Sequence, residues 1–280
     1  MEIDKSWVNT WAKWILSDAA NLNRYFNIAA MHPDYSINNQ ILLVSQAMDR
    51  PVTMLKDESS WNKLGASVNA SGQPFYIWEP EKDADGNVIY DASGKRPAGY
   101  RYKPMYDVTD TDYEYIKEKA VPEQALEALL TETEIPIVVC DEIKNVTGKR
   151  AMYVPVEKTI FVVRSGVAPA DDFFCAIATE LGHAYCHEQM KDKAMAYNRA
   201  SYHFGCAACA HALAGKWELS TESLDVSVVP DRWVQMSDRA AGSEILRLRN
   251  IFAEIHTKMA EPLKQIMERD RAGGEVHERT

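Results

Sequence analysis

The chain has 280 residues, of which 46% are hydrophobic and 26% charged, with a formal net charge of −10 at pH 7. This balance is typical of a globular protein with one large or two compact domains, and it excludes a disordered chain. The acidic charge excludes a uniformly basic surface that coats duplex DNA, so any contact with nucleic acid has to be local. No apolar run approaches the ~18–20 residues of a membrane-spanning helix, and the N-terminus lacks the pattern of an export signal, so we expect a cytoplasmic protein with no membrane partner.

Two helices are predicted before residue 51. Apolar residues recur at helical spacing over residues 6–30, and the pattern stops before Pro33, because proline disfavours helix in the residue that precedes it. A second helix is expected over residues 36–48, ahead of Pro51.

A small antiparallel sheet is predicted next. Glycine and proline separate three short aromatic runs, at residues 75–78, 88–90 and 100–102, and such runs between turn residues are typical of strands. The dipeptides Asp85-Gly86 and Ser93-Gly94 are the expected hairpin corners.

The composition shifts between residues 112 and 134, and we place a domain boundary there, giving domains at residues 1–120 and 121–280. The second domain is expected to be mainly helical with a β-hairpin, so the fold class is α+β. Its predicted elements are a helix at residues 122–130, a strand at 135–140, a hairpin at 151–163 and helices at 171–191, 195–217 and 243–271.

Five cysteines lie in this second half, mostly among alanine and phenylalanine in helical patterns. An odd number of cysteines in such a setting is typical of reduced thiols in a cytoplasm and argues against a disulfide framework. The five are Cys140, Cys175, Cys186, Cys206 and Cys209.

The segment Thr179-Glu180-Leu181-Gly182-His183 is related to a zinc-peptidase motif. In His-Glu-x-x-His, two histidines four residues apart share a helix face and bind one metal, while the glutamate between them polarises the metal-bound water. Here the glutamate and the second histidine are present, but threonine stands in place of the first histidine. A hydroxyl is a poor zinc ligand.

This segment resembles the metallopeptidase domain of ImmA/IrrE-like and ArdC-like proteins, a gluzincin-type scaffold in which a β-hairpin precedes the motif helix. The helix often continues to a further histidine four residues on, as it does here at His187. The resemblance implies a third ligand on the following helix, at or near His203. It therefore implies a zincin-like domain with His183 and His203 as metal ligands and Glu180 as the catalytic base, degenerate through Thr179, with zinc as the candidate cofactor.

Each of these residues also has a structural interpretation. Glu180 either acts as a general base or remains as a scaffold residue that caps the helix or pairs with a nearby base. His183 and His203 either bind metal or are hydrogen-bonded core histidines. If the site were active, zinc-activated water would attack a peptide carbonyl with Glu180 as the base, and loss of the first ligand undermines that chemistry.

A second resemblance begins at Tyr35-Ser36-Ile37-Asn38-Asn39-Gln40. It is similar to the N-terminal domain of ArdC-like antirestriction proteins and LtrC-like proteins of mobile elements, in which Tyr-Ser-x-x-Asn-Gln begins a helix. The likeness continues in three further ordered blocks, at residues 61–65, 74–80 and 102–108. It implies that residues 1–120 form a domain that binds single-stranded DNA.

Binding of single-stranded DNA requires exposed rings for base stacking and cations or amides for phosphates. Residues 1–150 nevertheless contain 16 lysines and arginines against 23 acidic residues, so we expect weak, salt-sensitive binding. Alternatively, the aromatic residues form a half-buried sheet packed on the first helix, and the asparagines cap the second helix. The candidate contacts are Tyr76, Trp78, Arg101, Tyr102, Lys103, Asn38 and Asn39.

The leading hypothesis is an ArdC-like antirestriction or anti-defence protein of a phage or mobile element. It would bind single-stranded DNA or a host defence protein and carry an inactive metallopeptidase domain. Two alternatives remain open: an active zinc metallopeptidase with a non-standard ligand set, and an inhibitor that binds proteins only.

Overall fold

The computed structural model describes residues 3–48, 50–117, 119–131, 133–143, 148–164, 168–190 and 197–277. The chain forms two compact units, the first from residues 1–117 with 231–245 and the second from residues 118–230 with 246–280. The predicted second domain began at residue 121 and included residues 231–245, which here belong with the first unit. Within the described ranges, no helix is long and apolar enough to cross a membrane.

Three helices open the first unit: α1 (Lys5–Leu16), α2 (Ala19–Met31) and α3 (Ile37–Ala47). The single helix predicted over residues 6–30 is wrong, because the helix is interrupted at Ser17 and Asp18. The Asp18 carboxylate accepts a hydrogen bond from the Ala20 amide at 2.8 Å and so caps a new helix. The predicted helix over residues 36–48 is confirmed, and the Ser36 hydroxyl accepts from the Asn39 amide at its start.

The sheet of the first unit contains β1 (Leu55–Lys56), β2 (Phe75–Pro80) and β3 (Tyr100–Asp107), antiparallel in the order β1-β3-β2. The strand predicted at residues 88–90 is wrong, because Val88 and Tyr90 form only isolated bridges to Lys82 and Pro97. Both predicted corners are turns, with positive φ values at Gly86 and Gly94. The short helices α4 (Glu58–Lys63), η1 (Val108–Asp110) and α8 (Asp231–Val234) were not predicted.

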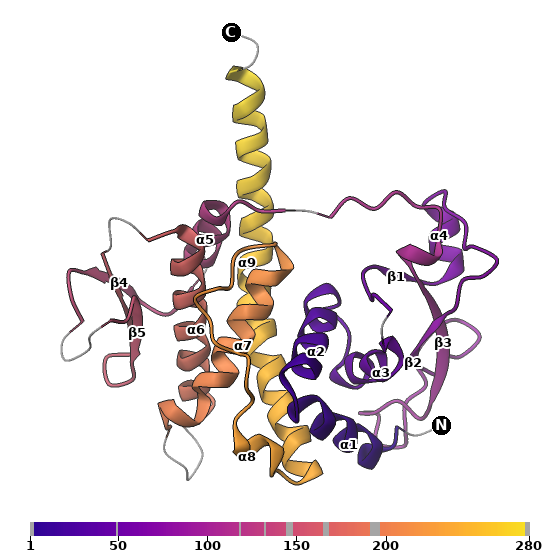
Figure 1. The fold of residues 1–280 in the computed structure, drawn as a ribbon. Helices are drawn as coiled ribbons and strands as arrows, with labels where there is room; N and C mark the ends of the chain where they lie inside the picture. Colours follow the sequence, from indigo (N-terminus) through magenta and orange to yellow (C-terminus); the bar gives the residue numbers. More distant parts are fainter. Residues whose placement is uncertain are drawn as a thin grey trace. The chain divides into compact units, whose positions relative to one another are not determined.

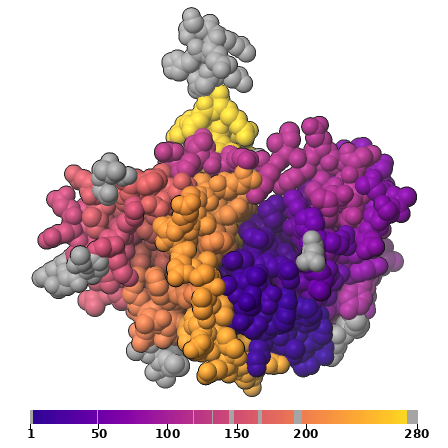
Figure 2. Space-filling view, in the orientation of Figure 1, coloured from indigo at the N-terminus to yellow at the C-terminus, as the bar shows by residue number. Residues whose placement is uncertain are grey.

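The core of the first unit forms where α1, α2 and α3 turn their apolar faces toward one another, and a smaller cluster surrounds Trp61, Ala66 and Val108. Full burial of side chains of this size contributes roughly 1.5–3 kcal/mol each. In the space-filling view, the surface of the α1–α3 segment (indigo) adjoins the surface of the strand-bearing segment (purple) (Figure 2). Side chains buried to 1% exposure or less in this core include Ile15, Leu16, Leu22, Tyr25, Phe26, Ile41 and Leu43.

The second unit contains α5 (Pro122–Thr131), β4 (Ile137–Cys140), β5 (Ala151–Val154), β6 (Thr159–Val163), α6 (Ala170–Glu188) and α7 (Arg199–Lys216). The predicted hairpin is confirmed as β5 and β6, and β4 joins it in parallel to give the order β4-β6-β5. Helix α6 packs along α7 and also against α5 and β5 (Figure 1).

The long helix α9 (Asp238–His277) begins five residues before its predicted start at residue 243. The predicted end of the motif helix at Lys191 and the predicted start of the next helix at Met195 lie outside the described residues. Helices with two small three-stranded sheets confirm the α+β class.

Candidate functional site

The motif segment lies on the most deeply buried part of α6. Thr179 and Glu180 are each 3% exposed and His183 is fully buried. This burial follows from position, because α6 lies between α7, α5 and β5 and has small or apolar residues at most positions from Phe174 to Ala184. A buried glutamate is costly unless it is paired, so its partners determine what it can do.

Glu180 is held by an ion pair and by the backbone of the neighbouring strand. Arg199, at the start of α7, donates to both carboxylate oxygens, with Nη1 2.7 Å from Oε2 and Nη2 bonded to Oε1. The Tyr153 amide of β5 donates to Oε2 at 2.7 Å. A general base has to reach the proton it abstracts, and this carboxylate is turned toward a guanidinium. The structure therefore agrees with the interpretation of Glu180 as a residue paired with a nearby base.

The structure brings His183 and His203 together. Nε2 of His183 lies 3.0 Å from Nδ1 of His203, and the two rings are parallel to within 3°. Tyr197 Oη lies 2.8 Å from Nδ1 of His183. Burial, followed by the nearby charge of Arg199, lowers the pKa of His183 to about 2, and burial also raises the pKa of Tyr197.

Tyr197, His183 and His203 form one chain of hydrogen bonds. A neutral imidazole carries one N–H and one lone pair. One ring nitrogen of His183 therefore donates and the other accepts within this chain. Nε2 of His183 and Nδ1 of His203 are thus bonded to each other.

The donor set of this centre does not fit a zinc ion. The Thr179 hydroxyl donates back to the Cys175 carbonyl at 2.8 Å, within its own helix. His187 lies one turn beyond His183, but its Nδ1 is bonded to Tyr153 Oη at 2.9 Å. Among the residues that the structure describes, no group of three histidine, cysteine or acidic side chains converges as a metal site requires.

In the first unit, Asn39 supports the edge of the sheet. Its Nδ2 donates to the Trp78 carbonyl at 3.0 Å, and its Oδ1 accepts from the Trp78 amide at 2.8 Å. Gln46, two helical turns further along α3, makes the same pair of bonds to Tyr76, at 2.9 and 2.8 Å. These two amides satisfy backbone groups of an edge strand that would otherwise be open to pairing. The amide of Asn39, predicted to contact DNA, is therefore bonded to β2, whereas Asn38 is half-buried in the first turn of α3.

The predicted aromatic residues form part of a longer structure, which we call the aromatic band. Tyr76 and Tyr102 are 42% and 52% exposed, whereas Trp78 is buried. Trp78 contacts Trp7 of α1 edge-on, at 5.6 Å between ring centroids, and Trp11 and Trp14 continue the series at 6.0 and 5.1 Å. The α1 tryptophans were not predicted to belong to the site, although their spacing places them on one helix face. The band contains Trp14, Trp11, Trp7, Trp78, Tyr102 and Tyr76.

The two predicted cations beside the band have acidic partners. Arg101 donates to Glu79 at 2.8 Å, and Lys103 lies 2.6 Å from Asp57 and 3.7 Å from Glu79. Lys103, together with hydrogen bonds from Ser60, holds the pKa of Asp57 well below its usual range. Phosphate groups would compete with these carboxylates, so the charge available to attract nucleic acid is small.

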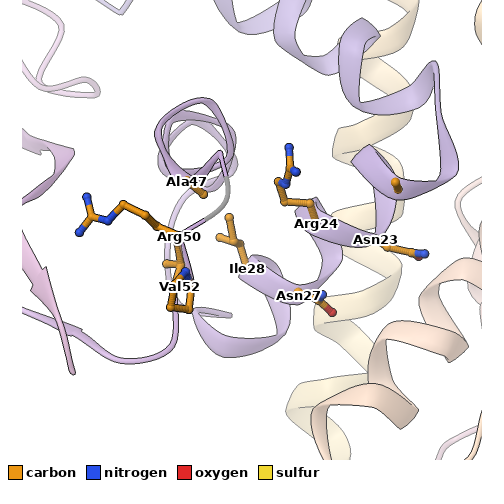
Figure 3. A pocket seen from close by; sticks show the side chains of 9 residues that line it. Asn23, Arg24, Asn27, Ile28, Ala47, Arg50 and Val52 are labelled. Atoms are coloured by element: carbon orange, nitrogen blue, oxygen red, sulfur yellow. The ribbon is translucent and has the colours of Figure 1, made fainter. Parts of the chain in front are cut away.

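A cavity of about 380 Å³ lies between α2 and the segment that follows α3 (Figure 3). Its lining includes Arg50, but the guanidinium group is directed away from Ile28 and Arg24. That group donates to Asp110 at 2.9 Å and lies over the Phe75 ring, 4.3 Å from its centroid. Arg24, a second cation in the lining, lies 5.9 Å from the centroid of the Trp14 ring. We assign no ligand to this cavity.

No protein-family model and no curated protein sequence matches the chain. Among solved structures, the Mn(II)-bound crystal structure of the antirestriction protein ArdC from plasmid R388 is similar, with a TM-score of 0.56 and 14% identity over 93% of this chain and 98% of ArdC. The metal-free ArdC structure matches with a TM-score of 0.42 and 17% identity, over 82% and 84% of the two chains. The predicted likeness to ArdC is thus confirmed at the level of structure, and the chain has an ArdC-like fold.

Proposed function

We propose that this chain is an antirestriction protein of a phage or mobile element and that it acts by binding, without hydrolysing peptides. The antirestriction role rests on the similarity to ArdC along almost the whole length of both chains. The proposed absence of peptide hydrolysis rests on the contacts made by Glu180, His183 and His203 in the centre on α6. Its glutamate pairs with Arg199, and its two histidines are bonded to each other.

The Glu180–Arg199 pair supports the proposed absence of peptide hydrolysis. For catalysis, Glu180 would have to release a guanidinium that binds both of its oxygen atoms in a site that is 3% exposed. The same guanidinium places a positive charge next to the position that a divalent ion would occupy. An active metallopeptidase with a non-standard ligand set would need both obstacles removed.

We propose single-stranded DNA as the partner, bound along the aromatic band. Every base offers a ring face for stacking, and each stacked base contributes roughly 1–3 kcal/mol without sequence preference. The half-exposed rings of α1 and the exposed Tyr76 and Tyr102 supply such faces. Because the flanking cations are paired with carboxylates, the affinity should be modest and should fall with added salt.

Protection of DNA from restriction in cells tests the proposed antirestriction role without peptide hydrolysis. Unmodified DNA would be introduced into a restricting host that expresses wild-type protein, Glu180→Gln or His183→Ala. We expect all three to protect the DNA equally, provided that their levels in the cell are matched. Loss of protection in both variants, with normal folding and with peptide cleavage by the wild type, would favour the active metallopeptidase.

Fluorescence anisotropy of a labelled single-stranded oligonucleotide tests whether single-stranded DNA binds along the aromatic band. Trp7→Ala and Tyr102→Ala should each weaken binding by about tenfold, which corresponds to about 1.4 kcal/mol. Tyr90→Ala is the matched control, because Tyr90 is 55% exposed but lies outside the aromatic band. Protection in cells without any oligonucleotide binding at low salt would replace this partner with a host defence protein and favour the purely protein-binding inhibitor.

A further inference from the structure

Two buried thiols meet between α6 and α7, outside the ion pair and histidine pair described above. Sγ of Cys186 lies 3.8 Å from Sγ of Cys206, and the two residues are 1% and 0% exposed. None of the five cysteines forms a disulfide in this structure. These two sulfur atoms are already close, so formation of a bond between them needs only a small movement.

Gly182 explains why the two helices approach so closely here. It precedes Cys186 by one helical turn and therefore lies on the same face of α6. A Cβ atom on Gly182 would lie 3.0 Å from Cβ of Cys206 and 3.3 Å from its Cα. A disulfide needs Cα atoms about 4.4–6.8 Å apart, and such separations between helices require a small residue at the crossing.

The surroundings give the two thiols different roles. Arg247 of α9 donates from Nη1 to Sγ of Cys186 at 2.9 Å, and its guanidinium lies over the Tyr202 ring at 4.6 Å. A neighbouring cation favours the thiolate, which is the nucleophilic form. Burial and the adjacent Cys186 raise the pKa of Cys206, which therefore remains a thiol. Cys186 is accordingly the attacking sulfur and Cys206 the resolving one.

We propose that Cys186 and Cys206 are a redox modification site that closes to a disulfide when the protein meets a small peroxide. The Cys186 thiolate attacks one peroxide oxygen, the O–O bond breaks, and the leaving hydroxide takes up a proton to become water. Cys186 is then a sulfenic acid. The Cys206 sulfur attacks the Cys186 sulfur, the S–O bond breaks, and the departing hydroxide leaves as water with the Cys206 proton. The two sulfurs lose two electrons and hydrogen peroxide becomes two waters.

The disulfide would join the helix that carries Glu180 and His183 to the helix that carries Arg199 and His203. It would also close the loop formed by residues 187–205, so the oxidised protein should resist unfolding more strongly than the reduced one. A small oxidant is required, because the buried thiols are reached only through local opening of the two helices. The proposal does not depend on the proposed function.

The first test oxidises the full chain with hydrogen peroxide and measures its intact mass, followed by peptide mapping without reductant. The wild type should lose two hydrogen atoms and yield a peptide that links Cys186 to Cys206. Cys209→Ala should behave in the same way. Cys209 is buried on α7 like Cys206, but its thiol donates to the Leu248 carbonyl. Cys186→Ala and Cys206→Ala should not lose this mass. Addition of oxygen without a cross-link, no reaction, or a cross-link that survives in Cys186→Ala would each overturn the proposal.

Arg247 provides a second readout that a merely structural role would not change. Arg247→Met should slow disulfide formation about tenfold at pH 7, while Arg247→Lys should retain most of the rate because it keeps a cation near the thiol. Equal rates in both variants would remove the assigned role of Arg247. Oxidation should also raise the thermal midpoint of the wild type by about 6–10 °C, and an unchanged or lower midpoint would contradict the closed loop.

Discussion

Replacing Arg199 with methionine tests the assignment of the α6 centre most informatively, because it leaves the Glu180 carboxylate without its cation. The glutamate side chain is 4% exposed and the arginine side chain 22%. Removal of one partner from a buried pair costs about 3–5 kcal/mol, since the remaining charge is desolvated and uncompensated.

A double-mutant cycle separates the pair from its surroundings. Glu180→Gln should cost only about 1–2 kcal/mol, because Arg199 still reaches solvent and the amide oxygen can still accept from Tyr153. The combination of Glu180→Gln with Arg199→Met should recover about 2–3 kcal/mol relative to the sum of the single changes. Urea unfolding followed by circular dichroism at pH 7 measures all four proteins. A cost below about 1 kcal/mol for Arg199→Met, or additive single changes, would refute a buried ion pair.

Three further outcomes follow from the structure. Asn39→Ala should destabilise the first unit by about 2–3 kcal/mol in urea unfolding, and Gln46→Ala by less because its bonds to Tyr76 are exposed. Negligible effects of both variants would show that these amides do not stabilise the β2 edge. Burial, then the charge of Lys216, lowers the pKa of His256 to about 4. The unfolded chain therefore binds an additional proton between about pH 6.5 and pH 4, so stability should fall as pH decreases through this window. The fall should be smaller in His256→Phe, and an unchanged pH dependence would contradict the assignment. Thr179→Val should leave the unfolding free energy within about 1 kcal/mol of wild type, because its hydroxyl donates to the Cys175 carbonyl within its own helix; a larger loss in urea would indicate a further partner.

Much of the fold could be predicted because its elements follow local patterns. Helical spacing and proline positions located α3 and α5, and alternation with turn residues located the β5–β6 hairpin. The break between α1 and α2 was missed because the apolar spacing continues through it, and only the Asp18 cap marks a new helix. Residues 88–90 have strand-forming side chains but make isolated bridges, which shows that strand propensity is realised only when a partner strand is present.

The histidine pair of the candidate site was expected from the family resemblance. That resemblance implied a ligand at or near His203 beside His183, and the structure places Nδ1 of His203 3.0 Å from Nε2 of His183. Arg199 was missed, although it lies four residues before His203 and therefore shares a face of α7 with it. The bonds from Asn39 to Trp78 join residues 39 positions apart, and no local pattern encodes a contact of that separation.

Metal content of the purified protein shows whether the α6 centre has lost its metal site. Wild-type protein, His183→Ala and the double variant Thr179→His/Arg199→Ala would be expressed with added zinc and manganese, dialysed and analysed by inductively coupled plasma mass spectrometry. We expect far less than one metal ion per wild-type chain. We expect a gain in the double variant, which restores a second imidazole four residues from His183 and removes the competing cation. About one ion per wild-type chain, lost in His183→Ala, would contradict this expectation.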